Sequence, residues 1–345
     1  MKIERINKSK LDSIDFNSLP FGKYFSDHML ICEYIDNRWL EPHIKPYSEI
    51  SISPCAQVFH YGQSIFEGMK AYRKKNEVFL FRPEENFKRF NNSAERLAMP
   101  KINEEIFIKG IKELVKLDRE WVPEKYNSAL YIRPFMIATE EYIKAMPSRK
   151  YMFMVITAPT GAYYDNKIDV KIEQKYSRSS PGGVGFTKAG GNYASAFEPT
   201  RIAQKEGFTQ LIWTDACEHK YLEECGTMNI FFVINNKIIT PELSDSILGG
   251  ITRDSIITLA KEKGYVVEER KISIEEIYDA EHKKTLKEVF GTGTAVTIGK
   301  IKSITSKLGK IEINQHKITD KLKTSLLDIQ YGESEDIFNW RLKIK

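Results

Sequence analysis

Short apolar runs separated by polar turns recur in the first half of the chain and predict antiparallel strands. Met29 to Ile35 is mostly apolar and ends at Asp36-Asn37, a dipeptide typical of hairpin turns. Lys70 to Arg73 and Val78 to Phe81 are two further strand-like runs, and the polar residues between them would turn the chain. We therefore expect hairpins early in the chain.

A helical period of apolar residues follows these strands. Pro83 suits the first helical position, and the two acidic residues behind it favour the positive end of the helix dipole. A second helix is expected at about 104–116, and strands are expected at 129–138 and 151–158. The apolar side chains of the first helix recur at three- and four-residue spacing, at Phe87, Phe90, Ala94 and Leu97.

The second half alternates strands and helices after a change of character. Residues 159–166 are punctuated by Pro, Gly and Asn, which predicts a connection between domains. A chain of 345 residues is near the limit for one hydrophobic core. We therefore predict a smaller N-terminal α/β domain at 1–160, a connection at 161–168 and a larger C-terminal domain at 169–345. The predicted fold class is α+β, that is, mixed α/β.

Three local patterns organise the predicted C-terminal domain. A helix is expected at 195–206, and a hairpin at 228–240 would turn at Asn235-Asn236. Thr252 is expected to cap a further helix at 253–263, because a threonine side chain can accept a hydrogen bond from the first helical turn.

The composition excludes several functional classes. The chain has 52 Lys+Arg against 47 Asp+Glu, and these charges are interspersed, so no nucleic-acid partner is expected. Its 12% aromatic residues, 20 glycines and 13 prolines do not match a disordered or collagen-like chain. The four cysteines, Cys32, Cys55, Cys217 and Cys225, show no metal-binding spacing, so no metal is expected. Without a signal peptide or a membrane-spanning run, a cytoplasmic protein without membrane association is predicted.

A lysine and a carboxylate stand in unusual surroundings. Lys188 lies in Thr187-Lys-Ala-Gly-Gly-Asn-Tyr193, where a desolvated amine would be available as a nucleophile for a Schiff base. Glu223-Glu-Cys-Gly-Thr-Met-Asn229 leads into an apolar strand, where a carboxylate can pair with a cationic ring nitrogen. Taken singly, an exposed loop lysine and a solvated turn are the alternatives.

Two glycine-rich turns offer anion sites. Leu248-Gly-Gly-Ile-Thr-Arg-Asp254 begins a predicted helix, and Phe290-Gly-Thr-Gly-Thr-Ala295 presents amides and hydroxyls. Each turn alone could be purely structural, and neither fits a dinucleotide fingerprint or a P-loop. A lysine, a carboxylate and two anion cradles together match the demands of pyridoxal phosphate.

These segments also carry a resemblance to a known family. Their order and spacing are similar to those of branched-chain amino acid aminotransferases, which are fold-type IV pyridoxal 5'-phosphate enzymes, and the resemblance extends over about residues 55–300. The segments that carry it are His60 to Lys70, Leu130 to Pro134, Lys188 to Tyr193, Glu224 to Asn229 and Gly291 to Ala295.

The resemblance implies a set of cofactor contacts. Lys188 would hold the cofactor covalently and act as the catalytic proton carrier, within the larger predicted domain. Glu224, which fits the family register better than Glu223, would pair with the pyridine nitrogen, and Tyr193 would meet the ring hydroxyl. Arg89 would bind the phosphate. The remaining cofactor positions implied are Thr227, Asn229, Ile251, Thr252 and Thr294.

The resemblance also implies a substrate pocket and an assembly. Tyr61 and the amides of Thr294 and Ala295 would receive the α-carboxylate, and Arg133 at the pocket's edge would meet the distal carboxylate of glutamate or 2-oxoglutarate. A homodimer with the active site near its interface is expected. The aromatic walls of the apolar pocket would be Tyr61, Phe66, Tyr131 and Tyr163.

The implied reaction is reversible, ping-pong transfer of an amino group between L-Leu, L-Ile or L-Val and 2-oxoglutarate. Two alternatives stay open at this stage. One keeps the fold and cofactor but acts as a D-amino acid aminotransferase or an aminodeoxychorismate lyase. The other is a non-enzyme that senses phosphate or binds a partner. The sequence does not rank Leu, Ile and Val.

Overall fold

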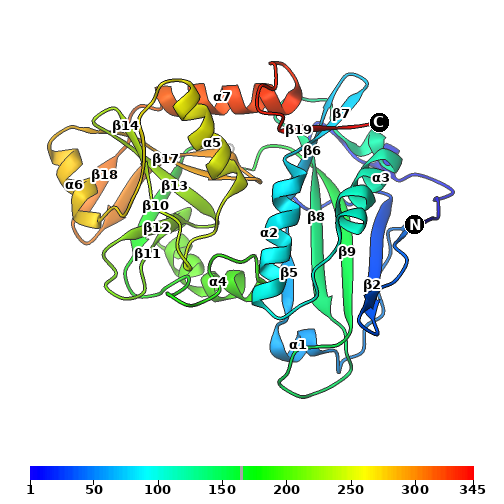
Figure 1. Ribbon diagram of the computed structural model, residues 1–345. Coiled ribbons are helices and arrows are strands. Elements are labelled where there is room, and N and C mark those ends of the chain that lie inside the picture. The colour runs from blue at the N-terminus through cyan, green and yellow to red at the C-terminus, as the bar shows by residue number, and fades with distance from the viewer. Residues whose placement is uncertain (164–165) are drawn as a thin grey trace. The chain divides into compact units, whose positions relative to one another are not determined.

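The computed structural model describes residues 1–163 and 166–345, which form two compact units (Figure 1). The first unit comprises Met1–Tyr163, Thr187–Gly191 and Asp328–Lys345. The second comprises the described residues 166–186 and 192–327. Residues 164–165, inside the predicted connection 161–168, lie outside the described residues. The predicted domain boundaries therefore remain predictions.

The first unit is built on one ten-stranded sheet. Its strand order is β1-β4-β2-β9-β8-β6-β7-β19, with β3 paired to β2 and β5 paired to β8. The two longest strands pair antiparallel along their whole length. The strands are β1 (Lys2–Ile3), β2 (His28–Ile35), β3 (Arg38–Trp39), β4 (His43–Pro46), β5 (Ser64–Phe66), β6 (Met69–Lys74), β7 (Glu77–Phe81), β8 (Ala129–Ala138), β9 (Tyr151–Thr160) and β19 (Arg341–Ile344).

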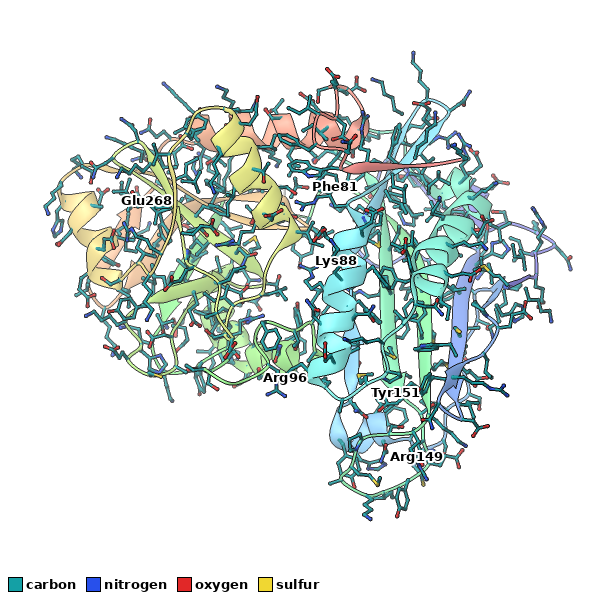
Figure 2. All side chains as sticks on the ribbon, viewed as in Figure 1. Phe81, Lys88, Arg96, Arg149, Tyr151 and Glu268 are labelled. Atoms are coloured by element: carbon teal, nitrogen blue, oxygen red, sulfur yellow. The ribbon has the colours of Figure 1, made fainter. Side chains whose placement is uncertain are left out.

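Helices and turns in this unit follow the expected sequence signals. Asp36 and Asn37 adopt positive φ in the turn between β2 and β3, as a tight hairpin requires. The helix α2 begins at Pro83 as predicted and buries Phe90 and Ala94 against the sheet. Figure 2 labels Lys88 and Arg96 on this helix. The helical segments are η1 (Leu11–Ser13), α1 (Gln57–Tyr61), α2 (Pro83–Arg96), η2 (Glu105–Lys109), α3 (Gly110–Leu117) and η3 (Arg119–Trp121).

The second unit contains a closed ring of six strands. The ring runs β12-β11-β10-β17-β16-β13, and a further pairing of β13 with β12 closes it. Closure gives every strand in the ring two neighbours and buries a small apolar core. The strands of this unit are β10 (Ile168–Glu173), β11 (Gln210–Thr214), β12 (Leu222–Cys225), β13 (Met228–Ile234), β14 (Lys237–Thr240), β15 (Val267–Glu269), β16 (Leu286–Gly293), β17 (Thr297–Ser306) and β18 (Gly309–Glu312).

Four longer helices accompany these strands. The helices α5 (Ile251–Glu262) and α6 (Ile274–His282) lie within the second unit, and α6 contributes Ile274 and Ile277 to the barrel core. The helices α4 (Gly190–Lys205) and α7 (Lys317–Tyr331) each have residues in both units. Over the described residues, no helix has the length and apolar character needed to cross a bilayer.

Two local predictions differ from the structure. The helix expected at 195–206 begins at Gly190, five residues earlier, and continues through Pro199. The helix expected at 253–263 begins at Ile251, and its N-cap is Gly250 in an extended conformation. Thr252 therefore lies inside the helix rather than capping it. The reason for the second difference is that the helical hydrogen bonds already begin at Gly250, whose carbonyl accepts from the Asp254 amide at 3.0 Å.

The segment Thr187–Gly191 groups with the first unit, whereas the sequence placed it within 169–345. Its backbone explains the difference. Ala189 forms a bridge with Ile65, and the Phe66 amide donates to the Lys188 carbonyl at 3.0 Å. These hydrogen bonds attach the candidate lysine to β5, more than a hundred residues earlier in the chain, which no local sequence pattern could indicate.

Candidate functional site

Lys188 is held by its backbone against two elements of the first unit. Its amide donates to the Ser93 hydroxyl at 3.1 Å, and its carbonyl accepts from Phe66 at 3.0 Å. Ser93 lies on α2, and Phe66 ends β5. Because both main-chain groups are engaged, the half-buried side chain leaves from a fixed point.

Phe66 brings two cations together in this unit. The Lys188 Nζ lies 4.7 Å from the centre of the Phe66 ring, and the Arg133 guanidinium lies 4.6 Å from the same ring. Aromatic faces attract cations by their quadrupole. The candidate lysine and the candidate arginine therefore both lie against the Phe66 ring, which places an apolar surface and two positive charges close together.

Arg133 is also attached to Tyr131, its neighbour on the same face of β8. The Arg133 Nη2 donates to the Tyr131 hydroxyl at 2.9 Å. The buried Tyr131 hydroxyl leaves no room at Gly68, because a Cβ there would lie 2.2 Å from it. The glycine in the Phe66-Glu-Gly segment is thus explained by its close approach to a candidate pocket wall.

Tyr163 completes the group of aromatic side chains through a residue that the sequence analysis missed. Phe21 packs edge-on against Tyr131 at 4.8 Å and against Tyr163 at 5.0 Å between ring centroids. Burial raises the pKa of Tyr163, so its hydroxyl stays neutral at physiological pH. No periodicity or motif singles out Phe21, because its role depends on contacts with strands far along the chain.

Tyr61 is placed differently from the other proposed pocket walls. It ends α1, and 42% of its surface is exposed. Its ring lies 6.2 Å from the neighbouring His60 ring, between centroids. Within the first unit the structure therefore brings together Phe66, Tyr131, Arg133 and Tyr163, and it leaves Tyr61 at the surface.

Arg89 lies against a buried acid that the sequence analysis did not single out. Its Nε and Nη2 donate to the two carboxylate oxygens of Glu67, at 2.7 and 2.9 Å. Burial alone would raise the pKa of Glu67, but Arg89, Lys188 and Asn86 lower it below its ordinary value. The acid is therefore ionised next to the candidate phosphate ligand.

Glu224 in the second unit is also a buried acid that lies beside an arginine. Its Oε2 lies 2.7 Å from the Arg178 Nε, and its Oε1 accepts from the Leu248 amide at 3.3 Å. Both side chains of the pair are buried. Arg178, which also donates to the Ser246 carbonyl at 2.8 Å, is a second residue that sequence reasoning missed.

The neighbouring Glu223 has different surroundings. Its carboxylate accepts a hydrogen bond from the Ser246 hydroxyl, and burial raises its pKa. Glu224, by contrast, pairs with an arginine. The structure thus distinguishes the two adjacent acids, and the one with the fixed cation is the one chosen from the family register.

Asn229 holds the turn that leads into α5. Its Nδ2 donates to the Leu248 carbonyl at 2.8 Å and to Glu224 at 3.3 Å. A Cβ at Gly250 would lie only 2.0 Å from the Asn229 Oδ1, so a larger residue at 250 would displace the Asn229 side chain. Ile251 and Thr252 form the first turn of the helix, where main-chain N–H groups have no helical acceptor.

The other predicted residues of this unit lie in turns or on α4. Thr294 and Ala295 are half-buried between β16 and β17, Thr227 is exposed between β12 and β13, and Tyr193 is half-buried on α4. Asn229 stands opposite Thr292 in the β13–β16 pairing. The buried Thr292 hydroxyl has no hydrogen-bond partner among the described residues.

Each unit presents groups that fit pyridoxal phosphate. In the first, an amine and a guanidinium lie near one buried carboxylate. In the second, a buried carboxylate paired with Arg178 lies beside the turn at Gly250 that opens a helix. An amine, a phosphate ligand, an acid for a ring nitrogen and a helix N-terminus are the donor set that this cofactor requires.

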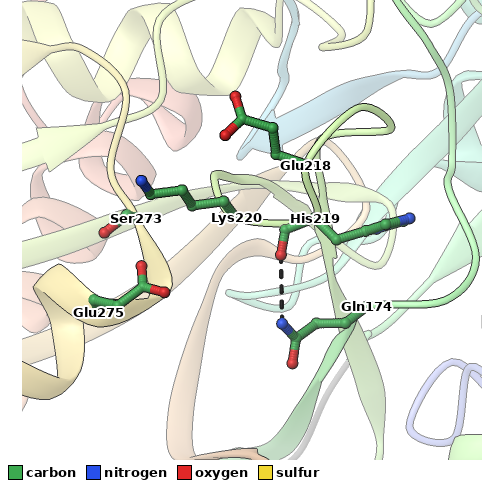
Figure 3. A pocket seen from close by; sticks show the side chains of 6 residues that line it. All are labelled: Gln174, Glu218, His219, Lys220, Ser273 and Glu275. Carbon is green, nitrogen blue, oxygen red and sulfur yellow. Dashed lines mark hydrogen bonds between the residues drawn. The ribbon is translucent and has the colours of Figure 1, made fainter.

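A surface pocket of the second unit is separate from these residues (Figure 3). It mixes acids and bases, and the Gln174 side chain donates to the His219 carbonyl across it at 3.4 Å. None of the predicted site residues lines it. Its lining residues are Gln174, Glu218, His219, Lys220, Ser273 and Glu275.

Comparisons with known proteins identify the family of the chain. Residues 64–304 match the family model described as amino-transferase class IV. The chain is 48% identical to a probable branched-chain-amino-acid aminotransferase of Staphylococcus aureus (strain MRSA252), over 100% of this chain and 98% of the relative. It is 43% identical to branched-chain-amino-acid transaminase 1 of Bacillus subtilis (strain 168), over 96% and 95%.

Solved structures extend the comparison to the fold. Two structures of the T.th. branched-chain amino acid aminotransferase are 26% and 27% identical to the chain, each with a TM-score of 0.73 and covering 91% of this chain and 98% of the other. One is complexed with N-(5'-phosphopyridoxyl)-L-glutamate and the other with 4-methylvaleric acid. The chain belongs to the class IV aminotransferase family and, within it, to the branched-chain amino acid aminotransferases.

Proposed function

We propose that this chain transfers the amino group reversibly between L-Leu, L-Ile or L-Val and 2-oxoglutarate, in two half-reactions of a ping-pong cycle. The full-length similarity to branched-chain aminotransferases supports the reaction. The glutamate and 4-methylvaleric acid groups in the two T.th. complexes support both substrate classes. The structural observation that carries the proposal is Lys188, whose main chain is fixed by Ser93 and Phe66 and whose amine lies 4.7 Å from the centre of the Phe66 ring.

Lys188 is proposed to hold the cofactor and to carry the proton. Bound pyridoxal 5'-phosphate supplies an electrophilic carbonyl carbon and an electron-withdrawing ring. The Lys188 amine would take the proton from the substrate Cα and return it at the cofactor C4′. The fixed backbone of Lys188 limits the positions that its amine can reach, which favours a short proton path.

Glu224 and its neighbours are proposed to hold the ring and the phosphate. Glu224 keeps the ring nitrogen protonated, and the ion pair with Arg178 offsets the cost of burying the Glu224 carboxylate. Tyr193 donates to the ring hydroxyl. Arg89, together with the N–H groups at the start of α5, binds the phosphate. Supporting positions in this assignment are Thr227, Asn229, Ile251, Thr252 and Thr294.

The substrate side chain is proposed to lie against Phe66, Tyr131 and Tyr163, with Arg133 at the edge. An arginine stacked on two aromatic rings is partly shielded without being isolated from polar groups. It can therefore remain in place when leucine occupies the pocket and still meet the distal carboxylate of glutamate. Tyr61, Thr294 and Ala295 would receive the α-carboxylate.

A homodimer is the proposed assembly, supported by an apolar patch on the first unit. Phe59 and Ile143 are 60% and 64% exposed, and Tyr61, Tyr142 and Met146 lie exposed in the same two segments. The Gln57 side chain donates to the carbonyls of Lys144 and Met146, which attaches this loop to α1. Exposed apolar patches of this kind mark interfaces.

The patch links the dimer to the site, because Tyr61 belongs to it and to the proposed carboxylate contacts. Arg149, labelled in Figure 2, donates from Nε to Glu140 at 2.8 Å and so closes the base of the loop.

Replacing Ile143 by Glu should convert the dimer to a monomer, measured by analytical ultracentrifugation. A wild-type chain that sediments as a monomer would contradict the assembly. A cytoplasmic location and a domain boundary at 161–168 are further parts of the proposal.

The reaction is tested by a steady-state substrate panel and one variant. We expect activity with L-Leu, L-Ile and L-Val against 2-oxoglutarate, and none with D-Ala or aminodeoxychorismate. Lys188→Ala should lose both transamination and the visible absorption of the lysine-bound cofactor. Full activity in Lys188→Ala would end the assignment. Activity with D-Ala but not with L-Leu would replace the proposed substrates.

A further inference from the structure

Glu67 is a buried acid for which the proposed reaction has no task. It follows β5 directly, and none of its side chain is exposed. Its amide donates to the Pro134 carbonyl at 2.7 Å, which fixes its main chain between two strands. Burying a carboxylate is costly unless charged or polar donors surround it. The structure therefore has to supply those donors, and which residues supply them points to what the acid does.

The donors around Glu67 come from α2 and from its own turn. Arg89 donates from Nε at 2.7 Å and from Nη2 at 2.9 Å, one bond to each carboxylate oxygen. Asn86 donates at 2.6 Å and the Gly68 amide at 3.0 Å. A planar guanidinium bound through two parallel hydrogen bonds has little freedom to rotate. Glu67 thus fixes both the position and the plane of Arg89.

The same helix connects Glu67 to the candidate lysine. Arg89 and Ser93 are four residues apart on α2, and the Ser93 hydroxyl donates to the Arg89 carbonyl at 3.0 Å. That hydroxyl also accepts from the Lys188 amide at 3.1 Å. Phe66, next to Glu67, donates to the Lys188 carbonyl. The arginine and the lysine therefore have a common support.

We propose that Glu67 is a positioning residue, which holds the guanidinium of Arg89 in the orientation that receives the cofactor phosphate. This inference rests on the proposed phosphate-binding function of Arg89. An arginine without a partner would sample many rotamers, and binding would have to order it. Glu67 orders it beforehand, and one carboxylate offsets part of the positive charge of Arg89 and Lys188.

The test compares two ligands that differ only in the phosphate. The full chain is freed of cofactor and titrated with pyridoxal 5'-phosphate and, separately, with pyridoxal, by visible absorption. Glu67→Gln places amide hydrogens against the Arg89 donors. We expect it to raise the Kd for pyridoxal 5'-phosphate about tenfold, the scale on which losing a ligand's supporting partner weakens a site. The Kd for pyridoxal should stay within about twofold, because it lacks the group that Arg89 binds.

Two further variants separate the possible causes. Arg89→Ala should show the same phosphate-selective loss, because it removes the proposed ligand itself. Asp118→Asn disturbs another buried acid of the first unit, which accepts from the His28 amide at 3.0 Å and pairs with the His28 ring. It should lower Tm without phosphate selectivity. Glu67→Asp, which keeps the charge but shortens the side chain, should fall between Glu67→Gln and wild type.

The outcomes distinguish the positioning role of Glu67 from the proposed phosphate-binding role of Arg89. If Arg89→Ala weakens only the phosphorylated ligand and Glu67→Gln changes neither Kd, the positioning role is overturned and the role of Arg89 stands. If Glu67→Gln weakens both ligands equally, as a structural defect would, the inference is also overturned. If Arg89→Ala shows no phosphate selectivity, the proposed function of Arg89 fails first.

Discussion

In each unit a candidate site residue belongs to an arginine–glutamate pair with a buried carboxylate, and the two pairs divide their roles in opposite ways. In the first unit Arg89 is the proposed ligand, and Glu67 is the support that orients it. In the second unit Glu224 is the proposed ligand, and Arg178 is the support. In both pairs, therefore, the residue proposed to bind the cofactor has a partner of opposite charge, and that partner comes from a distant part of the sequence.

The two supports also solve different electrostatic problems. Glu67 must be ionised to hold an arginine that is charged at any physiological pH, and its lowered pKa ensures this. Arg178 places a positive charge 2.7 Å from a carboxylate whose burial would otherwise be costly. Removing Glu67 should therefore disorder its partner, whereas removing Arg178 should leave its partner as a buried carboxylate without a cation.

The largest expected effect in this comparison comes from the acid of the second pair. Glu224→Gln removes the charge proposed to hold the ring nitrogen protonated. We expect kcat to fall about 10²- to 10³-fold, the scale of losing one preorganised electrostatic contact. Steady-state kinetics at saturating cofactor measures it.

A matched control for Glu224 lies in the same unit. Glu288 is also buried, and it accepts from the amides of Ile318 and Thr319 at the start of α7. Glu288→Gln should cost stability while kcat stays within about twofold, since it removes only hydrogen bonds remote from the proposed ring contact. Equal kcat losses in both variants would show that the effect of Glu224 is structural.

A smaller effect is expected from the support of that acid. Arg178→Met leaves a buried carboxylate without its cation, which should destabilise the fold by about 3 kcal/mol. Glu224→Leu in the same chain should recover much of this loss, because the pair is then replaced by apolar side chains of similar size. Denaturant unfolding of both variants gives the two values. A double variant no more stable than Arg178→Met would break the analogy between the two pairs.

The smallest expected effect is a difference in the pH dependence of stability. The lowered pKa of Glu67 gives stability that is present above the ordinary carboxyl value of about 4.3 and is lost as pH falls through the folded value. The pKa of Glu223 is raised by burial, so its contribution is present below about 4.3 and is lost as pH rises. The two acids therefore change stability with pH in opposite directions.

Thermal unfolding at pH 4 and pH 7 measures this difference. Relative to wild type, Glu67→Gln should lower Tm more at pH 7 than at pH 4. Glu223→Gln should be better tolerated at pH 7 than at pH 4, because it removes an acid that burial disfavours when ionised. Parallel changes for the two variants would mean that neither acid titrates as its surroundings imply.

Local signals in the sequence predicted much of the fold. The turns at Asp36-Asn37 and Asn235-Asn236 have the positive φ that their residue types favour, and Pro83 begins α2. These features depend on a few adjacent residues. The start of α5 was predicted two residues late, because the capping signal in the sequence lies at Thr252, whereas the helical hydrogen bonds begin at the Gly250 carbonyl.

The supports of the candidate site could not be predicted in the same way. Glu67 lies 22 residues from Arg89, and Arg178 lies 46 residues from Glu224, so neither pair has a spacing that a helix or strand would reveal. Phe21 meets Tyr131 and Tyr163 only through the folded sheet. The sequence motifs identified residues proposed to contact the cofactor. The residues that support them were found only in the folded structure.

Gly250 carries a consequence for how this sequence can vary. Its φ of −70° and ψ of 129° are open to any amino acid, so the backbone does not demand glycine there. The restriction is the volume of the Asn229 amide, whose Oδ1 would meet a Cβ at 2.0 Å. In a library that randomises both positions, larger residues at 250 should survive only beside a smaller residue at 229. The residues selected at positions 229 and 250, which lie twenty-one positions apart, would then be correlated.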